Sequence, residues 1–133
     1  WRSYYLQGAQ IVVVATCTMG LRADMFITEL RTRALESHTY VLATNRAGDE
    51  QVEGEPEPRH HFGKSLIVDP LGNLVVDPLD DTPWGYVSYE PDFESQKWAM
   101  GRLNWKRDRH PELYGIVADQ NFASRGLIFD KGF

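Results

Sequence analysis

Residues 11–14 read Ile11-Val12-Val13-Val14, four β-branched aliphatic side chains in a row, and the rest of the chain is best understood outward from them. Successive side chains of a strand point to opposite faces, so this run presents apolar groups on both sides. That pattern is typical of a strand covered on both faces, as in a layered α/β or sandwich core. We therefore expect a central strand here.

The residues before this strand have helical spacing. Trp1, Tyr4, Tyr5 and Leu6 have the apolar spacing of a helix, and Gly8 stands where a C-cap glycine would end it. Neither a Met nor a Ser, Thr, Asp or Asn cap precedes the first of these residues. We expect the chain to begin inside a helix and to be the later part of a longer protein.

After the first strand, a helix and a second strand are predicted. Apolar residues recur at spacings of three and four from Phe26 to Ala34, which predicts one amphipathic helix. Tyr40–Thr44 then has the composition of a strand, and Asn45–His61 is a long acidic segment with two glycines and two prolines, which we expect to be a loop. A strand, a helix and a second strand in this order indicate an α/β fold.

Three further elements follow. Pro70 and Gly72 favour a tight turn between Ser65–Val68 and Leu74–Val76, and this predicts a β-hairpin. Gly85–Tyr89 should be another strand. Asp92 is placed to cap a helix that runs to about Arg107.

Composition excludes several classes of function. The 133 residues contain 14 Lys and Arg against 19 Asp and Glu, a net charge of −5, which argues against a nucleic-acid or anionic membrane partner. The single cysteine, Cys17, cannot form an internal disulfide, so a reducing, cytoplasmic setting is expected. The longest apolar run, Ile11–Ala15, is too short to cross a bilayer.

Several blocks of sequence, taken in order, resemble the nitrilase superfamily of carbon-nitrogen hydrolases. The family commonly shows G-A-[DE] before a buried strand, R-A-x-E-N before the next strand, N-x-x-G after it, and G-x-S-x-[IV]-x-[DP]-x-G in a hairpin. The corresponding stretches here are Gly8-Ala9-Gln10, Arg33-Ala34-Leu35-Glu36-Ser37, Asn45-Arg46-Ala47-Gly48 and Gly63-Lys64-Ser65-Leu66-Ile67-Val68-Asp69-Pro70-Leu71-Gly72. Ser37 departs from the pattern, which has Asn there. Arg107 to Tyr114 is similar to the R-R-P-E-L-Y that often closes the family's last helix.

The resemblance implies a fold and an assembly. Residues 1–115 would be the C-terminal half of a four-layer α-β-β-α sandwich, and the missing N-terminal half would complete it. Residues 116–133 would form an extended tail that packs on a partner subunit of a homo-oligomer, and their apolar composition agrees with that.

The resemblance also implies a reaction. Relatives hydrolyse non-peptide C–N bonds in amides, carbamoyl compounds or nitriles through a thio-acyl intermediate, with no metal or organic cofactor. Their Cys nucleophile, Glu base and Lys would lie upstream of Trp1, so no catalytic residue is assigned within the chain, and the isolated chain should be inactive. An alternative is a catalytically inactive relative that serves as a binding or assembly subunit.

Cys17 does not match the family nucleophile, because it follows the Ile11 strand, where relatives usually have a small residue beside the substrate pocket. We predict that Thr16, Cys17, Thr18 and Met19 line that pocket. Two other interpretations remain open. Cys17 could be a small buried hydrophobe, or it could be the nucleophile of an unrelated thiol hydrolase, which requires a His or Glu within hydrogen-bond reach.

Two other sets of polar residues could be mistaken for active groups. Glu36 lies three residues after Arg33 and is expected to form a structural ion pair or cap rather than to act as a base. His60 and His61 are neighbours on an extended segment and point opposite ways, so we expect a solvated pair and no metal site.

Overall fold

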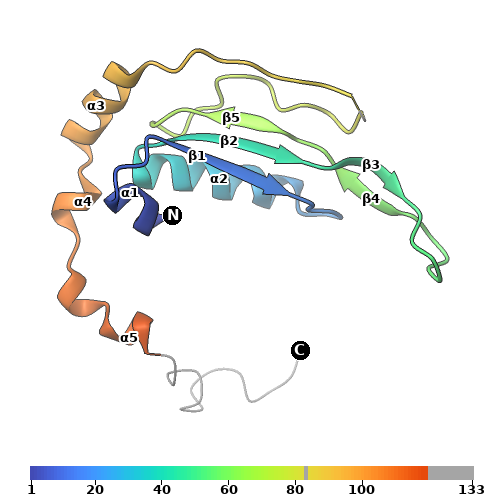
Figure 1. The fold of residues 1–133 in the computed structure, drawn as a ribbon, viewed down its shortest axis with the longest axis horizontal. Coiled ribbons are helices and arrows are strands. Elements are labelled where there is room, and N and C mark those ends of the chain that lie inside the picture. Colours follow the sequence, from blue (N-terminus) through green and yellow to red (C-terminus); the bar gives the residue numbers. More distant parts are fainter. Residues whose placement is uncertain (83, 120–133) are drawn as a thin grey trace.

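The computed structural model describes residues 1–82 and 84–119. Its elements alternate between helices and strands up to residue 45, continue as strands up to residue 68, and are helical afterwards (Figure 1). In order they are α1 (Arg2–Leu6), β1 (Ile11–Thr16), α2 (Ala23–Ser37), β2 (Tyr40–Asn45), β3 (Ala47–Glu50), β4 (Arg59–Phe62), β5 (Leu66–Val68), α3 (Phe93–Arg102), α4 (Trp105–Asp108), a 3-10 turn (Pro111–Leu113) and α5 (Gly115–Ala118). The predicted α/β fold class is confirmed.

The main sheet has three strands in the order β1-β2-β5. Strands β1 and β2 are parallel, with Ile11 opposite Tyr40 and Thr16 opposite Asn45, and α2 connects them as a β-α-β unit. Strand β5 runs antiparallel to β2. A separate hairpin of β3 and β4 continues from the end of β2 (Figure 1).

The core lies between α2 and one face of this sheet. Leu30 and Ala34, four residues apart on α2, pack against buried side chains of β2 and β5. These are Val41, Ala43, Leu66 and Val68. Val14 of β1 is half-buried against the same cluster. The periodicity that predicted the helix is therefore the periodicity with which α2 covers the sheet.

The prediction that residues 11–14 form a central strand covered on both faces is wrong. Strand β1 is an edge strand, because among the described residues it pairs with β2 alone. Its alternate side chains point away from α2, and there Ile11 is 40% and Val13 68% exposed. Strand β2 is central instead. The apolar composition of β1 suits burial, and one face of the strand packs against the core, but no described element covers its other face.

The segment predicted as one long loop, Asn45–His61, contains a hairpin. Strands β3 and β4 pair in antiparallel register, with Gly48 opposite His61 and Glu50 opposite Arg59. Sequence reasoning missed it because most of these residues have low strand propensity and show no apolar alternation.

The predicted turn after β5 is confirmed, although its second strand is short. The Asp69 amide donates to the Asn73 carbonyl at 2.9 Å, and Gly72 has the positive φ of +80° that the turn requires. Beyond the turn, pairing is limited to a bridge between Val68 and Leu74. Gly85–Tyr89 is not a strand, because no described strand offers it a ladder of hydrogen bonds.

The last predicted helix is two helices. Asp92 caps α3 as expected, and its side chain accepts a hydrogen bond from the Glu94 amide at 2.9 Å. Helix α3 ends at Arg102 rather than near Arg107, because Asn104 caps a separate helix, α4, by accepting from the Arg107 amide at 3.0 Å. A second helix cap ended the first helix early.

The predicted tail, residues 116–133, begins inside α5, and its residues 120–133 lie outside the described part of the chain. The expectation that it packs on a partner stays a prediction. No helix in residues 1–82 or 84–119 has both the length and the apolar character needed to cross a membrane.

Candidate functional site

The predicted pocket-lining loop, Thr16–Met19, leaves the sheet at the end of β1. The carboxyl ends of parallel strands lie at the same end of a sheet, so the end of β2 lies beside the end of β1. Asn45 is the register partner of Thr16. The β3–β4 hairpin starts at this same edge (Figure 1). Ligands of layered α/β folds gather at such strand ends, and this edge is the candidate site.

Asn45 holds the loop in place. Its Oδ1 accepts hydrogen bonds from Thr16 Oγ1 at 3.0 Å and from the Thr18 amide at 2.7 Å. Its Nδ2 donates to the carbonyls of Thr18 at 3.0 Å and of Gly63 at 2.9 Å. One half-buried amide thus joins β1, β2 and the residue after β4. Asn45 is the first residue of the N-x-x-G block, but the sequence pattern alone did not predict that its side chain would hold the loop.

Cys17 is exposed in the chain, so its interpretation as a small buried hydrophobe is wrong. The residue follows the last paired residue of β1, where the chain has left the sheet. Its Sγ lies 3.7 Å from Nδ1 of His61, within hydrogen-bond reach for sulfur. A nucleophilic side chain and an imidazole are therefore adjacent.

His61 is fully buried, whereas the side chain of its neighbour His60 is 53% exposed. The two rings point in opposite directions as expected, but the prediction that both are solvated is wrong for His61. Successive side chains of strand β4 point to opposite faces, so His61 faces the Cys17 loop and His60 faces Asp49.

Glu50 and Arg46 lie behind the imidazole. His61 Nε2 is 3.2 Å from Glu50 Oε2, and the same carboxylate oxygen is 2.7 Å from Arg46 Nη1. The Arg46 guanidinium, and then His61, lower the pKa of Glu50. Glu50 raises the pKa of Arg46, and Cys17 contributes in the same direction. Glu50 is thus a carboxylate near neutral pH and accepts a hydrogen bond from Nε2–H, which leaves the Nδ1 lone pair free to accept a proton from sulfur.

Cys17, His61 and Glu50 form a chain of two hydrogen bonds. In that chain Cys17 is the nucleophile, His61 is the base, and Glu50 orients the base. The requirement set for Cys17 as a nucleophile, a His within reach of its sulfur, is met. Across residues 1–82 and 84–119, no three His, Cys, Asp or Glu side chains are grouped so that they could hold a metal ion.

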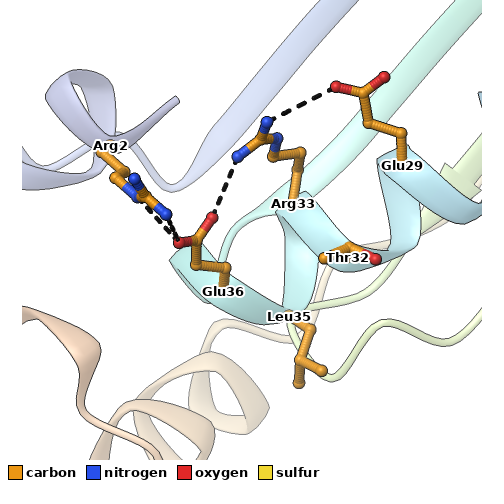
Figure 2. A pocket seen from close by; sticks show the side chains of 6 residues that line it. All are labelled: Arg2, Glu29, Thr32, Arg33, Leu35 and Glu36. Atoms are coloured by element: carbon orange, nitrogen blue, oxygen red, sulfur yellow. Dashed lines mark hydrogen bonds and ion pairs between the residues drawn. The ribbon is translucent and has the colours of Figure 1, made fainter. Parts of the chain in front are cut away.

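A hollow between α1 and α2 is the other notable feature, and its charged groups are already paired (Figure 2). Glu36 accepts from Arg2 Nε at 2.8 Å and lies 3.3 Å from Arg33 Nη1. Arg33 also lies 3.7 Å from Glu29. The prediction of a structural ion pair for Glu36 is confirmed. The network ties α1 to α2.

Comparisons with known proteins identify the fold and the family. A sequence profile described as carbon-nitrogen hydrolase matches residues 1–97. The chain belongs to the carbon-nitrogen hydrolase family. It is 32% identical to a probable nitrilase of Schizosaccharomyces pombe over 114 residues, which cover 85% of this chain and 39% of that relative. The predicted membership of the nitrilase superfamily is confirmed.

Solved structures of this family show the same fold. A carbon-nitrogen hydrolase from Helicobacter pylori G27 superposes with a TM-score of 0.75 at 21% identity, over 90% of this chain and 44% of that one. A mutant amidase of the nitrilase superfamily from Nesterenkonia AN1 superposes with a TM-score of 0.66 at 26% identity, over 85% of this chain and 37% of that one. The chain therefore spans less than half the length of these relatives. Family membership also overturns the view of Cys17 as part of an unrelated thiol hydrolase.

Proposed function

We propose that residues 1–133 form the C-terminal part of a hydrolase that cleaves non-peptide C–N bonds in small amides, carbamoyl compounds or nitriles. The Cys nucleophile, Glu base and oxyanion-stabilising Lys of the family would lie on the part of the fold that this chain does not contain. The chain's own contribution is then the β-α-β unit and one wall of the substrate pocket.

The open side of β1 carries this proposal. Ile11 and Val13 form an apolar surface on the sheet face opposite α2, and β1 has a free edge in the described part of the chain. An exposed apolar face beside an unpaired edge is what remains when neighbouring strands are absent. The match to only 39% of the yeast relative's length supports the same view. The upstream half would supply the second sheet of the sandwich.

The Thr16–Met19 loop is proposed as the pocket wall. Asn45 fixes its backbone through the Thr18 amide and carbonyl, so the loop is rigid enough to discriminate between substrates. Thr16 Oγ1 and the backbone of Thr18 are committed to internal bonds, which leaves the Cys17, Thr18 and Met19 side chains to contact a ligand.

The proposed reaction needs groups that this loop does not supply. A thiol attacks the amide or nitrile carbon while a base takes its proton, and a cationic donor stabilises the anion that forms. The amine or ammonia leaves, and water releases the acyl group from sulfur. Cys17 and His61 could supply the first two groups, but no lysine contact with them is found among the described residues, so we assign the covalent steps to the upstream half.

The decisive experiment compares the 133-residue chain with the same chain joined to the upstream half of its own protein. Both would be incubated with a panel of amides, carbamoyl compounds and nitriles, and release of ammonia would be measured. Turnover by the longer protein alone is expected. Turnover by the isolated chain would refute the assignment of the covalent steps. A longer protein that lacks the Cys, Glu or Lys and is inactive would establish the alternative, a binding or assembly subunit.

Cys17→Ala in the longer protein tests the pocket wall. If Cys17 lines the pocket, the ratio of kcat/KM between a small and a bulky amide should change while activity remains. A complete loss of turnover would instead make Cys17 the nucleophile. We further propose a homo-oligomer in a reducing, cytoplasmic compartment, on the basis of the single cysteine and the apolar composition of residues 116–133.

A further inference from the structure

We propose that Cys17 is a peroxide-reactive thiol, activated by His61 and Glu50, that is oxidised to a sulfenic acid. This inference goes beyond C–N bond hydrolysis and does not rest on it. It concerns a site assembled entirely from residues of this chain, whereas the proposed hydrolysis uses residues outside it.

The geometry provides the base. Nδ1 of His61 is 3.7 Å from the Cys17 sulfur, and the imidazole is fully buried, so its ring cannot turn away into solvent. The thiol itself is exposed and open to reagents. An accessible nucleophile beside a fixed, enclosed base distinguishes this cysteine from an ordinary surface thiol.

Glu50 fixes the proton on the far side of the ring. Its carboxylate accepts from Nε2 at 3.2 Å, so the Nδ1 lone pair faces the sulfur. When His61 takes the thiol proton, the carboxylate also stabilises the imidazolium that forms. The same carboxylate also holds Arg46, whose Nη1 lies 2.7 Å from Glu50 Oε2.

The arrangement favours a peroxide over a disulfide as the electrophile. Hydroxide is a much more basic leaving group than a thiolate, so cleavage of an O–O bond gains more from an acid that donates a proton as the bond breaks. His61, once protonated, is that acid. A peroxide is also small enough to reach an exposed loop without a binding cavity of its own.

The step balances as follows. Nδ1 of His61 takes the proton from Cys17 as sulfur attacks one oxygen of hydrogen peroxide, forming an S–O bond and breaking the O–O bond. The departing hydroxide takes the proton from the imidazolium and leaves as water. Sulfur loses two electrons and the peroxide gains them. Because the chain has one cysteine, no thiol of the same chain can condense with the product, and an external thiol must reduce it.

The test uses the 133-residue chain, in which every thiol reaction reports on Cys17. Hydrogen peroxide would be added in the presence of dimedone, and the adduct on the intact protein would be followed by mass spectrometry. The rate should be at least about tenfold higher in the folded chain than in the chain unfolded in urea, as general-base assistance predicts. Equal rates in the two states would overturn the proposal.

Neighbouring histidines provide a matched pair of variants. His61→Gln should lower the rate at least about tenfold, whereas His60→Gln, whose ring contacts Asp49 instead, should leave it within about twofold. Unchanged reactivity in a folded His61→Gln chain would refute the role of the imidazole. If that variant does not fold, Glu50→Gln decides: a slower reaction supports the relay, and an unchanged rate overturns it.

Discussion

Replacement of Asn45 by Ala should destabilise the protein by releasing the loop that follows β1. Its side-chain amide makes four hydrogen bonds, to Thr16 Oγ1, to the amide and carbonyl of Thr18, and to the carbonyl of Gly63. Thr16 Oγ1 retains its bond to the Thr44 carbonyl, so three main-chain groups lose their side-chain partner. At about 1 kcal/mol each, reduced where water can enter, the expected cost is about 2–3 kcal/mol of unfolding free energy.

Urea denaturation followed by far-UV circular dichroism measures this cost. The midpoint for Asn45→Ala should fall by roughly 1–2 M, given the slopes usual for small domains. Asn73→Ala is the matched control, because that exposed amide makes one side-chain bond, to Asp69 at 3.1 Å. In addition, the Thr18 amide should exchange its hydrogen faster in Asn45→Ala than in the native chain. An equal midpoint shift for the two variants, or unchanged exchange at Thr18, would refute the role given to Asn45.

Three further outcomes are expected. Gly63→Ala should lower the free energy of unfolding by about 2 kcal/mol or more, because φ is +65° and a Cβ would collide with the Asp80 carbonyl. Burial lowers the pKa of His38 despite its hydrogen bond to a backbone carbonyl, so its contribution to stability should be complete above about pH 6.5 and decline as the pH falls below that. Asp92→Ala should cost about 1 kcal/mol through loss of the α3 cap.

Each of these has its own check. Gly54→Ala shares a positive φ but meets no atom within 4 Å, so an equal loss in the two glycine variants would remove the steric argument. For His38, unfolding free energies measured between pH 7.5 and 5.5 should slope less in His38→Gln than in the native chain. Unaltered helicity and stability in Asp92→Ala would show that the cap is dispensable.

The β-α-β unit was predictable because its residues follow simple rules. The apolar spacing from Phe26 to Ala34 is the face that α2 buries, and the Tyr40–Thr44 strand differs from β2 by one residue. The cap at Asp92 and the turn at Gly72 were also predictable, since both depend on local backbone geometry. Elements whose formation depends on neighbours could not be placed in this way.

Strand β1 and Gly85–Tyr89 illustrate that limit. The first has the composition of a covered strand and lies at an edge of the sheet, and the second has the composition of a strand and pairs with no described strand. Composition reports what a segment tolerates, whereas pairing depends on which other strand is present.

The candidate site was half predictable. The Thr16–Met19 loop followed from its position after a strand, and the opposite orientations of His60 and His61 followed from strand alternation. The contact between Cys17 and His61 spans 44 residues and depends on the β3–β4 hairpin, which has no apolar pattern. The Gly- and Pro-containing stretch 51–58, which separates Asp49 and Glu50 from Arg59 and His60, is the signal that could have indicated the turn of this hairpin.

Strand β1 pairs on one side only within the described part of the chain, and this has a consequence for handling the protein. Six residues, Ile11 to Thr16, carry neither charge nor proline, and such a strand readily accepts a strand from another molecule. The chain on its own is therefore prone to stack into intermolecular sheets as its concentration rises, and a lysine at the outward-facing Val13 would act as a gatekeeper against that association.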